Sequence, residues 1–178
     1  MSSSYLGLDM ASNAIAPAEQ AVVLAPDDGR ARADLGEAYM RVDRMSDAID
    51  AFEIALELLG NEAAVIRSLV ECYASEERFA EAINAGQVLV AIEPAPQAWE
   101  RLGRAYFRQG DYDGSLESYR RAVELDPAYW PALNGIGVNE LNEWLRSDRT
   151  EAAAREAAGD ALLGTLQQVR SAYPTISG

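Results

Sequence analysis

Hydrophobic residues recur along the chain with the three- and four-residue spacing of amphipathic helices, and short polar breaks separate the stretches. Residues 34–60, 69–94 and 101–127 each contain two such stretches of about a dozen residues. Stretches of that length with this spacing are typical of helices that bury one face. The pattern therefore predicts an all-α chain built from consecutive pairs of helices.

The polar break RQGD at residues 108–111 carries the residues that end one helix and begin another. Gly110 suits the left-handed conformation that stops a helix, and Asp111 can cap the start of the next one. Pro127 cannot continue a helix and marks the end of the second stretch. These residues predict a tight turn between two antiparallel helices.

The same residue types return at a fixed distance. Tyr39, Tyr73 and Tyr106 are separated by 34 and 33 residues. Two further sets share that spacing: Leu35, Leu69 and Leu102, and Ala48, Ala82 and Ser115. A period of this length indicates a repeat protein, in which each helix pair buries its apolar face against its neighbours.

The repeated segment resembles the tetratricopeptide repeat, whose pattern of about 34 residues places Trp, Leu, Gly, Tyr, Ala, Phe or Tyr, Ala and Pro at set positions. For the copy at 96–129 the matches are Trp99, Leu102, Gly103, Tyr106, Ser115, Tyr119, Ala122 and Pro127. For the copy at 29–62 they are Leu35, Gly36, Tyr39, Ala48, Phe52 and Ala55. The copy at 63–95 keeps Leu69, Tyr73, Ala82 and Pro94, with Val70 in place of the glycine and Gly86 in place of the aromatic residue.

Both ends of the chain depart from the repeat pattern. Residues 5–28 fit a partial repeat, in which Pro17 is expected to kink or shorten the second helix. Residues 130–173 fit an irregular repeat with a longer connection and a long last helix from about Thr150 to Tyr173. The resemblance implies that residues 1–178 form a single domain, a right-handed α-solenoid of tandem antiparallel helix pairs.

The charge and composition of the chain limit the classes of partner that it can bind. The chain of 178 residues has 29 acidic and 15 basic residues, a net charge of −14, which argues against a nucleic-acid partner. All 15 basic residues are arginine, a composition typical of a GC-rich genome; arginine also binds carboxylates through two hydrogen bonds. Acidic repeat proteins of this kind are expected to bind protein or peptide partners.

The chain has no histidine and one cysteine, Cys72. This composition excludes catalytic pairs of serine or cysteine with histidine, and zinc sites built from histidine and cysteine. Cys72 precedes Tyr73 and is expected to be a buried thiol. We therefore expect no catalytic residue, no cofactor and no metal.

The resemblance implies that the first helices of successive repeats line a concave groove. The candidate residues there are Arg67, Glu71, Arg101, Arg104, Phe107, Arg108, Val138 and Leu141. Six of the 15 arginines and four of the 29 acidic residues fall on this face, which favours an acidic, partly apolar peptide. Alternatively, these arginines pair with Glu37, Glu71 and Glu100 along the helices and bind nothing.

Some members of the family clamp a C-terminal carboxylate with Lys, Asn and Arg at five positions. Here those positions hold Ala33, Glu37, Ser68, Gln97 and Arg101, of which only Arg101 matches. Glu37 would repel a carboxylate. A clamp for chaperone tails is therefore not expected.

Two functions stay open at this point. One is a non-catalytic scaffold that binds a partner segment in the groove. The other is a structural module of a larger bacterial protein, which forms a homo-oligomer when its irregular ends at 5–26 and 150–173 stack on another copy.

The chain begins without the basic and apolar segments of a signal peptide, and no stretch approaches about 18 consecutive apolar residues. No direct membrane insertion is expected. The cytoplasm is the expected compartment, with the periplasm open if the chain is a fragment that lacks its signal peptide.

Overall fold

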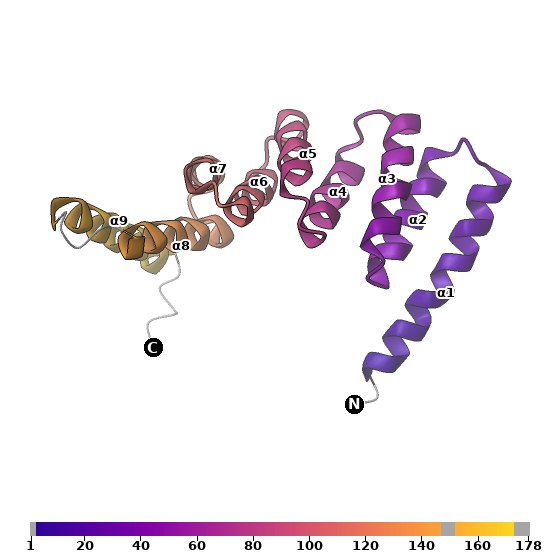
Figure 1. Ribbon diagram of the computed structural model, residues 1–178, viewed down its shortest axis with the longest axis horizontal. Coiled ribbons are helices and arrows are strands. Elements are labelled where there is room, and N and C mark those ends of the chain that lie inside the picture. The colour runs from indigo at the N-terminus through magenta and orange to yellow at the C-terminus, as the bar shows by residue number, and fades with distance from the viewer. Residues whose placement is uncertain (1–2, 147–151, 173–178) are drawn as a thin grey trace. The chain divides into compact units, whose positions relative to one another are not determined.

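The computed structural model describes residues 3–146 and 152–172, and every element there is an α-helix (Figure 1). This confirms the all-α solenoid of helix pairs. In chain order the helices are α1 (Ser3–Leu24), α2 (Gly29–Arg41), α3 (Met45–Leu59), α4 (Ala63–Ser75), α5 (Phe79–Ile92), α6 (Pro96–Gln109), α7 (Tyr112–Leu125), α8 (Trp130–Arg146) and α9 (Ala152–Ala172).

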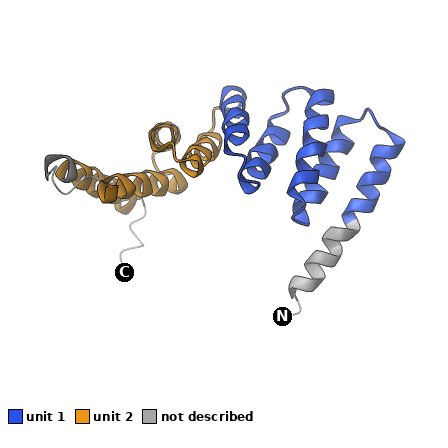
Figure 2. Ribbon diagram, in the orientation of Figure 1, with its two compact units in different colours: residues 1–93 blue, residues 94–178 orange. Residues whose placement is uncertain are grey.

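The helices form two compact units (Figure 2). The first, Met1–Glu93, contains α1 to α5, and the second, Pro94–Gly178, contains α6 to α9. Turns of a few residues join α2 to α3, α4 to α5 and α6 to α7, so the two helices of each pair run antiparallel. Each unit is described by itself below.

Glycines on the first helix of a pair accept an aromatic ring from the second. A Cβ atom at Gly36 would lie 2.6 Å from the ring of Phe52, which is 1% exposed. A Cβ atom at Gly103 would lie 3.0 Å from the ring of Tyr119. Glycine at these two positions therefore lets the paired helices approach closely.

The turns inside the pairs share one backbone conformation. Gly110 ends α6 with a φ of 90°, and the Asp111 side chain accepts a hydrogen bond from the Gly114 amide at 3.0 Å, as the RQGD sequence predicted. At the equivalent turns Asp43 and Glu77 have φ values of 62° and 58°. Left-handed backbone is unfavourable for residues with a Cβ atom, so these two turns are strained.

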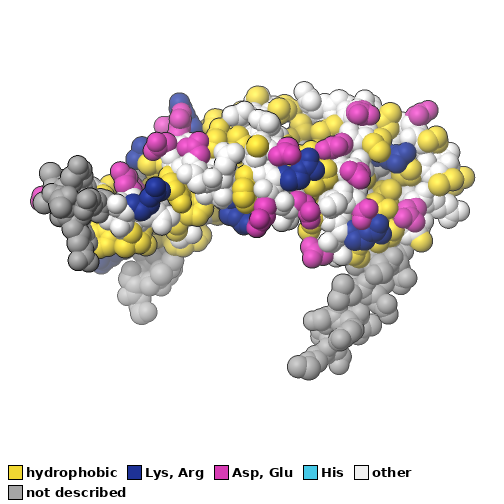
Figure 3. Space-filling view, viewed as in Figure 1, with side chains coloured by type: hydrophobic (Ala, Val, Ile, Leu, Met, Phe, Trp, Pro, Cys, Tyr) yellow, Lys and Arg dark blue, Asp and Glu magenta, His cyan; other side chains and the backbone are white. Residues whose placement is uncertain are grey.

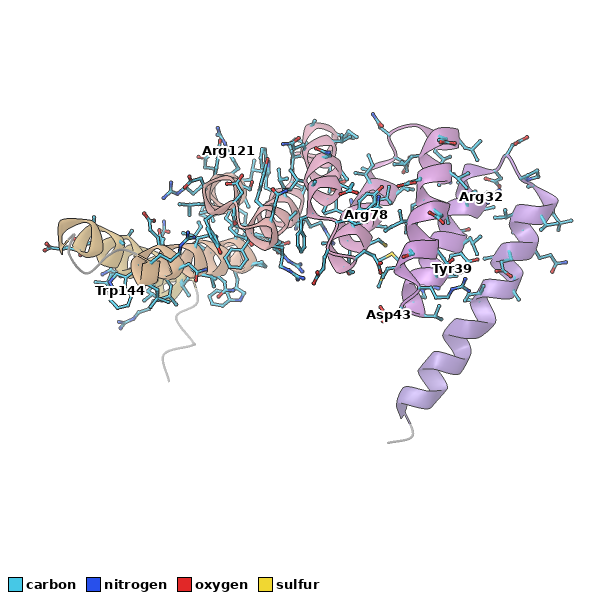
Figure 4. The ribbon with its side chains drawn as sticks, in the orientation of Figure 1. Arg32, Tyr39, Asp43, Arg78, Arg121 and Trp144 are labelled. Atoms are coloured by element: carbon cyan, nitrogen blue, oxygen red, sulfur yellow. The ribbon has the colours of Figure 1, made fainter. Side chains whose placement is uncertain are left out.

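A tyrosine of each first helix in the first unit binds the preceding helix pair. The Tyr39 hydroxyl donates to Glu19 at 3.0 Å, and the Tyr73 hydroxyl donates to Glu53 at 2.6 Å. The guanidinium of Arg78, labelled in Figure 4, stacks on the Tyr73 ring, with 4.7 Å between the Arg78 Cζ atom and the ring centroid. Arg44 stacks on Tyr39 in the same way at 4.4 Å.

Helix α1 continues through Pro17 to Leu24. Of the kink or shortening expected at Pro17, the shortening is therefore wrong. Ile15, Ala18 and Val22, on both sides of the proline, pack in one apolar cluster with Leu35 of α2. This packing offsets the backbone hydrogen bond that Pro17 cannot donate.

Within the described residues, no helix combines the length and apolar character that crossing a membrane would take.

The strained turns predict a stabilising substitution. Glu77→Gly should raise the free energy of unfolding by about 1 kcal/mol, because glycine adopts a positive φ without steric cost. Gly110→Ala is the matched reverse change and should lower it by a similar amount. Urea titration monitored by circular dichroism measures both. If Glu77→Gly destabilised the protein, the left-handed conformation at residue 77 would be wrong.

Candidate functional site

The second unit contains a hollow of about 390 Å³ between α6 and α8, which we call the α6–α8 hollow. Three predicted groove residues, Arg104, Phe107 and Val138, line it together. The other lining residues are Glu100 of α6, Tyr119 of α7, and Trp130, Pro131, Asn134 and Gly135 of α8.

Tyr119 connects the three helices around this hollow. A Cβ atom at Gly103 would lie 3.0 Å from its ring, and one at Gly135 would lie 2.5 Å away. The ring is 5% exposed. Because both neighbours lack a side chain, α6 and α8 approach the ring from either side and leave the hollow above it.

The walls of the α6–α8 hollow are largely apolar and partly exposed. Trp130 is 41% exposed and Val138 is 39% exposed. Sequence analysis missed Trp130, whose signal was a bulky residue at the first position of a first helix. Leu141, predicted as a groove residue, lies one turn after Val138, 42% exposed and outside the lining of the hollow.

One ion pair lies at the hollow. The Arg104 Nη1 atom is 3.7 Å from the Glu100 Oε1 atom, and the exposed fractions of the two side chains are 66% and 14%. The alternative expectation, that groove arginines pair with glutamates along the helices, is confirmed for this pair. Because the Arg104 side chain is 66% exposed, its guanidinium is accessible to a second carboxylate.

Burial raises the pKa of Tyr119 to about 12, and the nearby Glu100 carboxylate contributes to the increase. The hydroxyl is therefore neutral at physiological pH. Together with Asn134, it gives the hollow neutral polar groups beside its apolar walls.

The other predicted residues of α6 lie apart from the hollow. Arg101 is half-buried and Arg108 is exposed, and neither lines it. Of the three predicted arginines of α6, Arg104 alone lines the hollow.

The first unit has a separate hollow of about 320 Å³ along α2 and α4, the α2–α4 hollow. It is lined by Arg30, Ala33, Asp34, Glu37, Phe52, Leu59, Glu62, Ala64, Val65 and Ser68. Three of these residues are acidic and one is basic. Charges of both signs are interspersed on the face of the molecule that Figure 3 shows.

Arg67 and Glu71 of α4 were also predicted as groove residues, and neither lines the α2–α4 hollow. The Arg67 Nη2 atom bonds the Glu93 Oε2 atom at 2.7 Å, which connects α4 to the end of α5. Glu93 lies 26 residues away in sequence, so sequence spacing along one helix did not reveal this partner.

Buried polar contacts hold α8 in place. Asn139 donates from Nδ2 to the Ser115 hydroxyl at 3.0 Å and to the Gly135 carbonyl at 2.9 Å. The Thr165 hydroxyl of α9 donates to Glu140 at 2.7 Å. These contacts join α8 to α7 and to α9, and thereby orient the α8 face that lines the hollow.

The described residues contain no group of three or more Asp, Glu, His or Cys side chains placed to hold a metal ion. Cys72 is fully buried, and burial, with smaller contributions from Glu71 and Glu76, raises the pKa of its thiol to about 11. The expectation of a buried thiol at this position is confirmed.

Comparison with known proteins gives matches along most of the chain. Family models described as tetratricopeptide repeat match residues 3–63, 34–95 and 96–129. A relative from Mycosarcoma maydis, the small glutamine-rich tetratricopeptide repeat-containing protein 2, is 33% identical over 67 residues. That match covers 36% of this chain and 19% of the relative, so the chain aligns with about a fifth of the relative's length.

Solved structures share the fold at low identity. MamA 41-end from Desulfovibrio magneticus RS-1 is 17% identical with a TM-score of 0.75, over 90% of this chain and 86% of that one. YrrB, described as a protein of the repeat family with an unusual peptide-binding site, is 20% identical with a TM-score of 0.74, over 94% and 80%. The first repeat domain of Spaghetti (RPAP3), bound to an HSP90 peptide, is 20% identical with a TM-score of 0.61, over 65% and 92%.

The raised pKa of Cys72 predicts how stability depends on pH. The folded state keeps the thiol proton that the unfolded state releases, so the free energy of unfolding should fall as pH rises from about 9 to 11. Tyr119 contributes in the same direction at higher pH. Urea titrations across this range should show a flatter decline for Cys72→Ala than for wild type.

The rate at which a thiol reagent labels Cys72 at about pH 8 gives a second readout. Labelling should be slow in the folded protein, where the thiolate is scarce and inaccessible, and fast in urea. Equal labelling rates in the two states, or equal pH slopes for wild type and Cys72→Ala, would contradict the buried, protonated thiol.

Proposed function

Because the chain belongs to the tetratricopeptide repeat family, we propose that it is a non-catalytic protein-interaction scaffold that binds a partner segment on the faces of its first helices. The α6–α8 hollow is the principal anchor point. The observation that carries this proposal is the convergence of Trp130, Phe107 and Val138 with Arg104 in one hollow.

The chemistry of the hollow specifies the partner segment. A bulky apolar side chain of the partner enters the space between α6 and α8, where exposed Trp130 and Val138 lose contact with water. An acidic side chain of the partner next to it bonds the exposed guanidinium of Arg104. The partner is thus an apolar and acidic peptide segment.

Two solved relatives of the fold support peptide recognition. YrrB is described as having a peptide-binding site, and the Spaghetti repeat domain is described with a bound HSP90 peptide. This chain differs from a carboxylate clamp at four of the five clamp positions, so its segment is an internal stretch of the partner rather than a chain terminus.

A structural, self-associating role is the second candidate. It is favoured by two leucines of α9, Leu163 and Leu166, which are 57% and 53% exposed on the last described helix. This role does not involve the α6–α8 hollow.

A random peptide display library, selected on the purified protein, tests the peptide-binding role. The selected peptides should carry a bulky apolar residue beside Asp or Glu. Val138→Glu should weaken their binding by about tenfold or more, because a carboxylate replaces an apolar wall, and Arg104→Ala should weaken it several-fold.

Arg121→Ala is the matched control: Arg121 is an exposed arginine of α7 that pairs with Glu124 at 2.9 Å and does not line the hollow. Its binding should equal that of wild type. If the selected peptides bound wild type and Val138→Glu equally well, the α6–α8 hollow would not be their binding site.

A further inference from the structure

We propose that the outer face of α9 is a self-association surface, on which two copies of this chain pair with their α9 helices antiparallel. The inference deepens the second candidate role above and does not depend on peptide binding. The surface uses side chains of α9 that face neither α8 nor the α6–α8 hollow.

The orientation of α9 is set by its contact with α8. Thr165 is 6% exposed and donates to Glu140, which is also 6% exposed, at 2.7 Å. Ala158, two turns earlier on the same face, is 9% exposed. Thr165 and Ala158 therefore mark the face of α9 that packs on α8. Side chains displaced from them by about a third of a turn or more around the helix axis point toward solvent.

The outward side chains form what we call the α9 stripe: Glu156, Leu163, Leu166 and Arg170. Their spacings of seven, three and four residues place them along one face of the helix. Leu163 and Leu166 are 57% and 53% exposed at its centre. Glu156 and Arg170 are exposed at its two ends, and the described part of the chain provides neither with an ion pair.

The order of charges along the stripe specifies a second copy in antiparallel orientation. A twofold axis near Leu163 places Glu156 of each copy beside Arg170 of the other, with the leucines together at the centre. A parallel pair would instead place like charges beside each other. Such self-complementarity is what an isologous contact requires, whereas a different partner would need only to complement the stripe.

Within residues 3–146 and 152–172, no other segment covers this face. Two other second helices, α3 and α7, each pack against the first helix of the next pair, α4 and α8 respectively. The described residues contain no helix after α9. A single helix pair buries less area than the roughly 1,200 Å² of a standard interface, so we expect micromolar to sub-millimolar affinity.

Sedimentation equilibrium of the full chain, from about 5 to 500 μM, tests the pairing over this affinity range. Wild type should dimerise. Leu163→Glu should weaken the dimer by at least about 30-fold, because two carboxylates meet at the axis. Leu125→Glu is the matched control, since Leu125 is a leucine of α7 that is 51% exposed, and it should dimerise like wild type.

Charge reversal tests the orientation. Arg170→Glu alone and Glu156→Arg alone should each weaken the dimer several-fold, and the two changes together should restore it. Far-UV circular dichroism of each variant verifies that the helices are intact. A wild type that stays monomeric up to about 500 μM, or a double reversal that fails to regain the affinity lost, would overturn the proposal.

Disulfide trapping gives an independent measurement of the same geometry. Leu163→Cys should form a linked dimer on oxidation, whereas Gln167→Cys should not, because its Cα atoms would be about 12 Å apart along the helix axes. Cys72 is fully buried and does not compete. Disulfide formation at both positions would indicate a parallel pair, and disulfide formation at neither would show that the α9 stripe does not form the contact between copies. Either result overturns the proposal.

Discussion

The ring of Tyr119, held between two glycines, is the contact on which the second unit depends. Gly103 of α6 and Gly135 of α8 leave no room for a Cβ atom beside this ring, so three helices meet around one side chain. In the first unit the Phe52 ring fills the equivalent place against Gly36. Because a lone helix pair cannot bury its apolar face, the contact between Tyr119 and Gly135 extends the core of the α6–α7 pair to α8.

The same contact shapes the candidate site. Tyr119 forms the floor of the α6–α8 hollow, and the position of α8 beside it sets where Trp130 and Val138 stand. Asn139 and Glu140 hold α8 through hydrogen bonds to Ser115 of α7 and Thr165 of α9. The polar contacts orient α8, while the aromatic contact determines how closely it approaches α6.

The helix pairs could be predicted from sequence because their determinants are local. Gly110, Asp111 and the 34-residue recurrence of tyrosines specify turns and packing without knowledge of distant residues. The candidate site was harder to predict from the sequence, because the partners of its side chains depend on three-dimensional packing. Arg67 pairs with Glu93 on another helix, and Trp130 joins the hollow only because α8 packs against α6. The continuity of α1 through Pro17 was missed for the same reason, since its packing against α2 is a tertiary effect.

The most direct measurement is a double-mutant cycle of Gly135→Ala and Tyr119→Leu, with the free energy of unfolding as the readout. Alanine in a helix is ordinarily more stable than glycine by about 1 kcal/mol. If the ring occupies the space above Gly135, Gly135→Ala should destabilise the wild-type protein and stabilise the Tyr119→Leu protein, a coupling of about 1 kcal/mol or more. Equal stabilisation by Gly135→Ala in both backgrounds would contradict the account, because Tyr119 would then not join α7 to α8.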